Sequence, residues 1–139
     1  MKNISQEFSE LYDKVLIQYQ NNSARNQQFY NLSSNDEHYI NILYELNKPT
    51  LTSFSRKAKI SKPAATRIIQ RFLNKGYIIK QPSSTDGRVT YLQLSQALQE
   101  FCKDNTNLFD QVFLQCISSL SEKELAELKY LITKVNKKL

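Results

Sequence analysis

The sequence predicts a mainly α-helical fold that contains one small β-hairpin. Most of the 139 residues fall into segments whose apolar side chains recur every three or four positions, as in amphipathic helices. A single stretch, residues 77–94, is instead rich in isoleucine, valine, threonine and tyrosine and partly alternates apolar with polar positions. The length and the hydrophobic content of 40% suit one domain, 1–139, with its own core.

Long helices are predicted at both ends of the chain. Residues 4–20 carry an apolar stripe at helical spacing, and a polar stretch follows them. A further helix over residues 97–120 has a wide apolar face, and the last helix begins with a capping box formed by Ser121 and Glu124. The apolar face of residues 98–120 is too wide for one partner helix, so we expect a dimer.

Two shorter helices are predicted before the middle of the chain. The first is capped by Ser33 or Ser34 and ends before Pro49. Its predicted apolar face consists of Tyr39, Ile42, Leu43 and Leu46. Thr50 is expected to cap the second helix, which would bury Phe54.

The next predicted helix, residues 61–75, has two contrasting faces. Ser61 is its cap, and Pro63 occupies its first turn, where a missing N–H costs little. Gly76 suits the left-handed backbone position that follows many helices. The inward face consists of Ala65, Ile68, Ile69 and Phe72, and the outward face consists of Lys62, Thr66, Arg67, Gln70 and Arg71.

Two strand-like segments, "YIIKQP" and "RVTYLQL", follow that helix. The six residues from Ser83 to Arg88 are predicted to join them as a hairpin, with Gly87 in the turn and Asp86 before it. Taken alone, this would be an ordinary surface hairpin. After a short helix, a tight turn and a longer basic helix, it becomes the wing of a winged helix-turn-helix.

Positive charge is concentrated in this same region. The chain has a formal net charge of +6, and between Arg56 and Arg88 nine basic residues accompany one acid, Asp86. That segment alone carries +8, so the rest of the chain carries −2. A basic segment confined to a quarter of the chain predicts a polyanionic partner, and we expect double-stranded DNA.

The predicted DNA contacts follow from what each groove of DNA admits. Helix 61–75 would enter the major groove, where Arg67 and Gln70 can form bidentate contacts with guanine or adenine. Basic side chains and the helix N-terminus would contact phosphates. The slim tip of the wing, residues 78–94, would bring Arg88 into the minor groove, with its guanidinium held by Asp86. The predicted contact residues are Ser61, Lys62, Pro63, Thr66, Arg67, Gln70, Arg71, Lys75, Asp86 and Arg88.

Three stretches of the chain also carry a family resemblance: "LSSNDEHYINILYEL", "SKPAATRIIQRFLNKGYI", and "DGR" followed by "VTYLQLS". With Ser61, Thr66, Phe72 and Gly76 at their positions, these stretches resemble the MarR family of bacterial transcription regulators. The resemblance implies a homodimeric repressor. In it, residues 1–32 and 96–139 would form dimerisation helices, and residues 33–95 would read a palindromic operator. It also implies control by a ligand, a metal or an oxidant.

Two places depart from the usual pattern of that family. Phe54 and Ser55 stand where a leucine–alanine pair is usual, which would loosen the packing of the short helix. Lys80, Gln81 and Pro82 stand in the first strand of the wing, where an arginine is common, which would lower DNA affinity.

A small-molecule effector is the expected form of control. His38, Cys102 and Cys116 do not make a tetrahedral metal site, and neither a metal nor a cofactor is predicted. The two cysteines would lie about 21 Å apart along one helix, too far for an intrachain disulfide. Aromatic side chains at helical spacing either belong to the core or line an effector pocket. The candidate pocket residues are Tyr12, Tyr19, Tyr30 and Tyr39.

Enzymatic and membrane functions are not expected. One histidine, no nucleophile motif and no glycine-rich loop leave no candidate catalytic residue. No apolar run approaches the roughly 20 residues that span a bilayer, and the polar N-terminus is not a secretory signal, so a cytoplasmic location is predicted. The alternative function is a protein–protein adaptor on the same fold, whose basic helix contacts an acidic partner. Such an adaptor has no reason to bind random duplex DNA.

Overall fold

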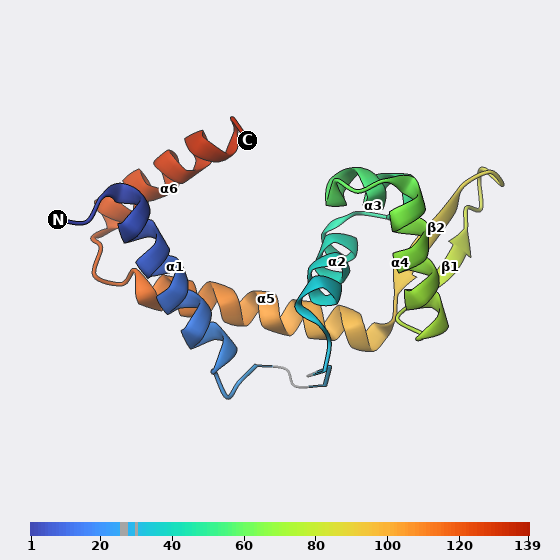
Figure 1. Ribbon diagram of the computed structural model, residues 1–139, viewed down its shortest axis with the longest axis horizontal. Coiled ribbons are helices and arrows are strands. Elements are labelled where there is room, and N and C mark those ends of the chain that lie inside the picture. The colour runs from blue at the N-terminus through green and yellow to red at the C-terminus, as the bar shows by residue number, and fades with distance from the viewer. Residues whose placement is uncertain (26–27, 30) are drawn as a thin grey trace. The chain divides into compact units, whose positions relative to one another are not determined.

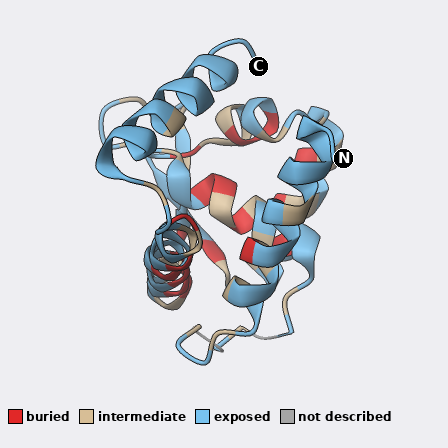
Figure 2. Cartoon of the chain, turned by 90° about the vertical axis from the view of Figure 1, so that its left-hand side faces the viewer, coloured by how far each residue is buried: buried red, intermediate tan, exposed pale blue. Residues whose placement is uncertain are grey.

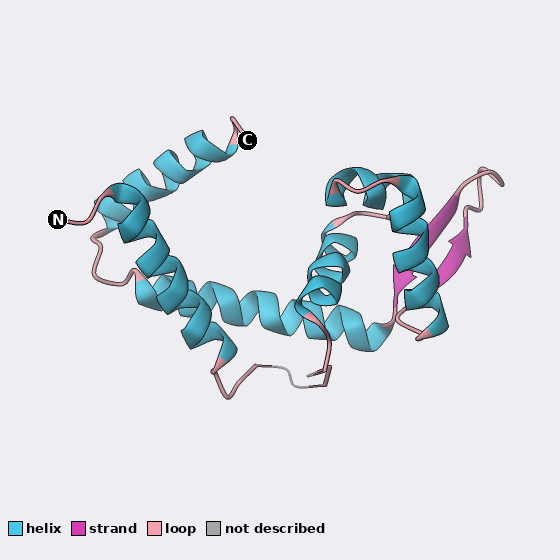
Figure 3. Cartoon of the chain, viewed as in Figure 1, coloured by secondary structure: helices cyan, strands magenta, loops and turns pink. Residues whose placement is uncertain are grey.

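The computed structural model describes residues 1–25, 28–29 and 31–139. Within these residues the chain forms six helices and one two-stranded antiparallel sheet, so the predicted fold class is confirmed (Figures 1 and 3). In chain order the elements are α1 (Ile4–Gln20), α2 (Ser34–Glu45), α3 (Leu51–Ala58), α4 (Lys62–Asn74), β1 (Ile78–Pro82), β2 (Thr90–Leu94), α5 (Gln96–Cys116) and α6 (Glu122–Asn136).

The chain divides into two compact units. The terminal unit comprises Met1–Arg25 and Thr106–Leu139, and the central unit comprises Asn26–Asn105. Helices α2, α3 and α4 and the hairpin β1–β2 all belong to the central unit. Helices α1 and α6 belong to the terminal unit, while α5 contributes its beginning to the central unit and its end to the terminal unit.

One hydrophobic core holds the central unit together. Phe54 of α3 and Phe72 of α4 are completely buried, and they belong to a cluster with side chains from α2, both strands and the beginning of α5 (Figure 2). Ile40 is also completely buried, although the sequence pattern did not place it on the apolar face of α2. Tyr39, which that pattern did place there, is half-buried and packs its ring edge-on against Phe54, with the centroids 5.9 Å apart.

The helix starts of the central unit follow the predicted capping chemistry. Ser33, rather than Ser34, caps α2, and its hydroxyl accepts a hydrogen bond from the backbone N–H of Asp36. Thr50 caps α3 in a reciprocal arrangement with Ser53, and Ser61 caps α4. At the end of α4, Gly76 takes a φ of +74°, a left-handed conformation that side chains disfavour. These local bonds fix where α4 begins and ends.

The hairpin forms as predicted, with one difference in its turn. Ile78 pairs with Leu94 and Pro82 with Thr90, which leaves seven connecting residues rather than the six expected. The backbone N–H of Leu92 also donates to the carbonyl of Pro49 at 2.7 Å, which ties the sheet to the segment before α3. Gly87 does not take a left-handed φ, so the turn itself does not require glycine; the residue only keeps the tip slim.

The terminal unit, by contrast, leaves much of its apolar surface uncovered. Val15 is the only buried residue of α1, and α6, described along its whole length like α1, buries none. Helix α5 ends at Cys116, four residues earlier than expected, because the backbone N–H groups of Ser118 and Leu120 bond three residues back and Ser121 caps α6. The exposed apolar residues of α1, α6 and the adjoining part of α5 include Ile4, Phe8, Ile17, Phe109, Leu114, Tyr130, Leu131 and Val135.

Candidate nucleic-acid interface

Helix α4 presents a polar face to solvent because its opposite face is anchored in the core. Ala65, Ile69 and Phe72 are buried at helical spacing. Successive residues of a helix are about 100° apart, which places Thr66, Arg67 and Gln70 on the other side. All three are exposed. The amide of Gln70 donates to Asn74 Oδ1 at 3.1 Å, whereas Arg67 makes no ion pair with any described residue.

The start of α4 has the chemistry of a phosphate site. The Ser61 hydroxyl accepts a hydrogen bond from the backbone N–H of Ala64 at 3.2 Å, and Pro63 lies in the first turn. Ser61, Lys62 and Pro63 are all exposed. The first N–H groups of a helix have no partner within the helix, and the helix dipole adds positive potential there. The predicted phosphate contacts at this end are therefore accessible together.

Arg71, also predicted to contact phosphate, already has a partner inside the chain. Its Nη1 donates to Oδ2 of Asp36 at 2.8 Å, and its guanidinium carbon lies over the Phe72 ring, 5.4 Å from the centroid. Asp36 is buried, which the sequence pattern did not reveal because a carboxylate at the third position of α2 suits a capping motif. Lys75 is exposed, and its ammonium lies 5.7 Å from the centroid of the Tyr77 ring.

The tip of the wing contains the expected arginine–carboxylate pair. The backbone N–H of Arg88 donates to Oδ1 of Asp86 at 3.0 Å, and the Arg88 Nε donates to the same oxygen at 3.3 Å. The side chain of Arg88 is nevertheless 93% exposed. One shared oxygen therefore restrains the side chain near its base and leaves the terminal nitrogens of the guanidinium available to a partner.

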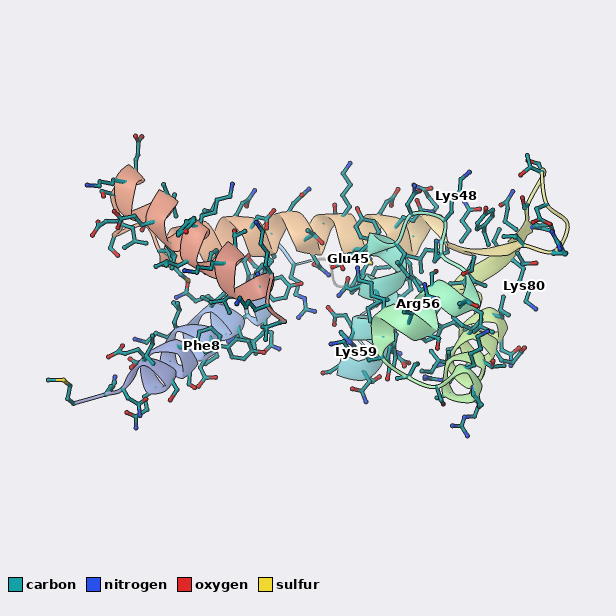
Figure 4. The ribbon with its side chains drawn as sticks, turned by 90° about the horizontal axis from the view of Figure 1, so that it is seen from above. Phe8, Glu45, Lys48, Arg56, Lys59 and Lys80 are labelled. Carbon is teal, nitrogen blue, oxygen red and sulfur yellow. The ribbon has the colours of Figure 1, made fainter. Side chains whose placement is uncertain are left out.

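The remaining basic residues extend this positive surface over the central unit. All nine basic residues between Arg56 and Arg88 are exposed. Arg56 and Lys59 come from α3 and its end, and Lys80 comes from β1 (Figure 4). Lys57 pairs with Glu45 at 2.9 Å, so α3 also has a basic residue that is already compensated.

The four tyrosines proposed to line an effector pocket are not brought together in one unit. Tyr12 and Tyr19 belong to the terminal unit, and Tyr39 belongs to the central unit. Tyr12 is exposed, and Tyr19 packs edge-on against Phe109. Tyr30 lies outside the described residues. A role for these residues in ligand binding stays a prediction.

The two cysteines differ in their surroundings. Cys102 is buried in the core of the central unit, and burial, with help from the charges of Glu37 and Glu45, raises the pKa of its thiol to about 12. Cys116 is half-buried in the terminal unit, where its Sγ lies 3.5 Å from Oε1 of Gln18. Across the part of the chain that the structure describes, no three His, Cys, Asp or Glu side chains gather as metal ligands would.

Sequence reasoning missed a cleft beside the wing. It has a volume of about 710 Å³ and lies between the end of α2, the segment before α3 and the two strands. Tyr44, Pro49, Pro82 and Tyr91 contribute to its walls, and Lys48 brings a positive charge to its lining. No sequence signal marks it, because the cleft depends on how the wing packs against α2.

Comparison with known proteins places this architecture in context. Residues 32–90 match the sequence model of the MarR family, while comparison with curated proteins finds no sequence match. Streptococcus pneumoniae FabT in complex with DNA shares the fold at 20% identity and a TM-score of 0.76, over 96% of this chain and 93% of that chain. Staphylococcus aureus MepR bound to ethidium bromide is 18% identical with a TM-score of 0.71, over 99% of this chain and 96% of that chain. The apo form of wild-type MarR from Escherichia coli is 17% identical with a TM-score of 0.59, over 97% of this chain and 98% of that chain. None of the described helices is long and apolar enough to cross a bilayer.

Proposed function

Because the chain belongs to the MarR family of winged helix-turn-helix transcriptional regulators, we propose that it is a homodimeric repressor that reads a palindromic operator. In this proposal α4 enters the major groove and the tip of the hairpin enters the neighbouring minor groove. Regulators of this family are non-catalytic, which agrees with the expectation that the chain is not an enzyme.

The exposed face of α4 is the observation that carries the DNA-reading proposal. Arg67 has the fork of donors that matches the two acceptors of guanine, and Gln70 has the donor and acceptor that match adenine. Both side chains stand on a helix whose other face is buried, so binding does not require them to leave the core. The exposed start of α4 and Arg88 at the wing tip would fix the register of the helix on DNA.

The uncovered apolar surface of the terminal unit supports the homodimer. Phe8 on α1 is 65% exposed (Figure 4). Tyr130 on α6 is also 65% exposed, and neighbouring apolar residues extend both patches. A surface of this kind is unfavourable in water and marks an interface. We propose a second copy of this chain as the partner, because a twofold axis would also place two copies of α4 on a palindrome.

Control by a small molecule is the remaining part of the proposal. MepR, which has the same fold, is described with bound ethidium, and the 710 Å³ cleft beside the wing of this chain has the volume of a small-molecule site. Thermal denaturation in the presence of a compound library would identify ligands, because a ligand that binds only the folded chain raises Tm. Tyr91→Ala, in the wall of the cleft, and Tyr39→Ala, outside the cleft, would show whether the ligands bind in the cleft or at the predicted tyrosine.

Selection from a pool of random duplexes tests the DNA-reading function. We expect enrichment of an inverted repeat whose half-sites lie about 10 base pairs apart, one turn of DNA. Titration of the enriched duplex with the parent chain and with Arg67→Gln should show a loss of about 1–3 kcal/mol in binding free energy for the variant. A folded chain that binds no duplex at low salt would contradict the proposal and favour the adaptor.

A further inference from the structure

The ion pair between Arg71 and Asp36 joins the flank of the DNA-reading helix to α2. Arg71 is about 100° around α4 from Gln70, so it lies at the border of the exposed face rather than at its centre. Its side chain is 44% exposed, whereas the carboxylate that it contacts at 2.8 Å is 8% exposed. The guanidinium is therefore accessible to solvent and DNA, while its partner is not.

Because Asp36 is buried, separating its carboxylate from the Arg71 guanidinium is unfavourable. The residue occupies the third position of α2, and its backbone N–H donates to the Ser33 hydroxyl at 3.1 Å, which holds the start of the helix in place. If Arg71 turned away toward a phosphate, it would leave a buried carboxylate without its cation, and such a charge is costly. A phosphate would have to compete against that cost for the same guanidinium.

We propose that Asp36 is a positioning residue that withholds Arg71 from the DNA backbone and so lowers the affinity of the chain for DNA of any sequence. This inference rests on the proposed DNA-reading function. Phosphate contacts carry no sequence information, but each adds affinity and salt dependence. One cation per protomer is thus removed from sequence-independent binding, although its position on α4 would allow the contact.

The substitution Asp36→Asn tests this role because it removes the charge and keeps the shape of the side chain. It releases Arg71, so binding to a random duplex should tighten. The slope of log K against log salt should steepen by about 0.9 for each phosphate gained. At 0.1 M salt this change in slope corresponds to an increase in DNA affinity of up to about eightfold per protomer, taking 1 M salt as the reference. If Asp36 merely stabilised the fold, the substitution would leave the slope unchanged.

Three further variants complete the test. Arg71→Gln serves as the reference background, because it removes the cation that Asp36→Asn would release. The double variant Asp36→Asn with Arg71→Gln should have the same salt slope as Arg71→Gln alone, since no cation is left to release. Arg67→Gln is the matched control on the same helix, and it should weaken binding to the selected duplex even though Asp36 is intact.

Titrations of labelled duplex at four salt concentrations, with circular dichroism as a folding check, decide the outcome. A parental slope in folded Asp36→Asn overturns the inference alone, and so does a double variant whose slope is steeper than that of Arg71→Gln. If Asp36→Asn fails to fold, Asp36→Ser replaces it, since it also removes the charge at this position and must steepen the slope in the same way. A parent chain that binds no duplex overturns the inference together with the proposed function.

Discussion

The central and terminal units use their apolar residues in opposite ways. In the central unit, Phe54 and Phe72 are completely buried within a continuous core. In the terminal unit, α6 buries no residue and α1 buries only Val15, although both helices, described from end to end, begin with well-formed capping boxes. Local helix signals are therefore equally good in the two units, and the difference lies in what covers the apolar faces.

This contrast shows which part of the molecule can hold its shape alone. Burial of apolar side chains is the main favourable contribution to folding, and capping adds only about 1 kcal/mol per helix. The central unit obtains that burial from its own elements. The terminal unit obtains only part of it from its own elements, where Val15, Leu108, Val112 and Ile117 are buried, and the proposed second copy would supply the rest.

Replacing one phenylalanine in each unit should give the largest difference. Phe54→Ala removes a completely buried ring and should lower the free energy of unfolding by about 3–5 kcal/mol. Phe109→Ala in the terminal unit removes a ring that is 40% exposed and packs edge-on against Tyr19, so its cost in dilute monomer should be much smaller. Urea denaturation at several protein concentrations measures both. If both substitutions lowered the free energy of unfolding by the same amount at every protein concentration, the proposed difference between the two units would be wrong.

Charges on the exposed apolar surface should dissociate the proposed dimer. The double substitution Phe8→Glu with Tyr130→Glu places two carboxylates on the patches of α1 and α6, and desolvating them in an interface is unfavourable. We expect a monomer of about 16 kDa in sedimentation and weaker binding to the palindrome, since two linked half-sites no longer act together. Ser9→Glu, which adds a charge to an exposed polar position of α1, should leave the dimer intact. A parent chain that already sediments as a monomer would refute the dimer.

Arg88→Ala should weaken DNA binding without changing stability. The side chain is almost fully exposed and its ion pair with the Asp86 carboxylate lies at the surface, so its loss removes little from the fold. Each half of the dimer would lose a minor-groove contact of about 1–3 kcal/mol. Lys80→Ala should cost less and be partly restored at low salt, because Lys80 can offer only a screened phosphate contact. Parental affinity in folded Arg88→Ala would show that the wing is only a structural hairpin.

Most of the fold, but less of the site, could be predicted from the sequence. Ser61, Pro63 and Gly76 mark the ends of α4 through local chemistry, and the structure confirms each of them. Local signals also predicted the hairpin and its Asp86–Arg88 pair. Features of this kind depend on residues a few positions apart, which is why a single sequence is sufficient to find them.

Contacts between distant segments escaped prediction. Asp36 and Arg71 are 35 positions apart, and nothing in either segment signals that a capping-type carboxylate would be buried against an arginine of α4. The burial of Ile40 depends in the same way on how α2 meets its neighbours. Gly87 lies in the predicted turn, but its φ is not left-handed, so the turn itself does not require a glycine.

Chemical labelling of Cys102 and Cys116 should show how readily each thiol becomes accessible in its unit, without perturbing function. At pH 8 a small alkylating reagent should modify half-buried Cys116 readily. Cys102 should react only when the central core opens, since its side chain is buried and its thiol pKa of about 12 leaves almost no thiolate. The variant Cys116→Ser isolates the slow site, and mass spectrometry follows its modification in rising urea.

The labelling rate of Cys102 should then track the free energy of unfolding measured for the whole chain, and peroxide should leave DNA affinity unchanged. Because the folded chain raises the pKa of the Cys102 thiol, the protonated thiol contributes fully to the stability of the fold below pH 9, the ordinary pKa of a cysteine. This contribution is lost as the pH rises toward about 12. Rapid labelling of Cys102 in the absence of urea would show that the core of the central unit opens easily. The two units would then differ only in how much apolar surface a partner has to cover, and not in whether the central unit has a stable core of its own.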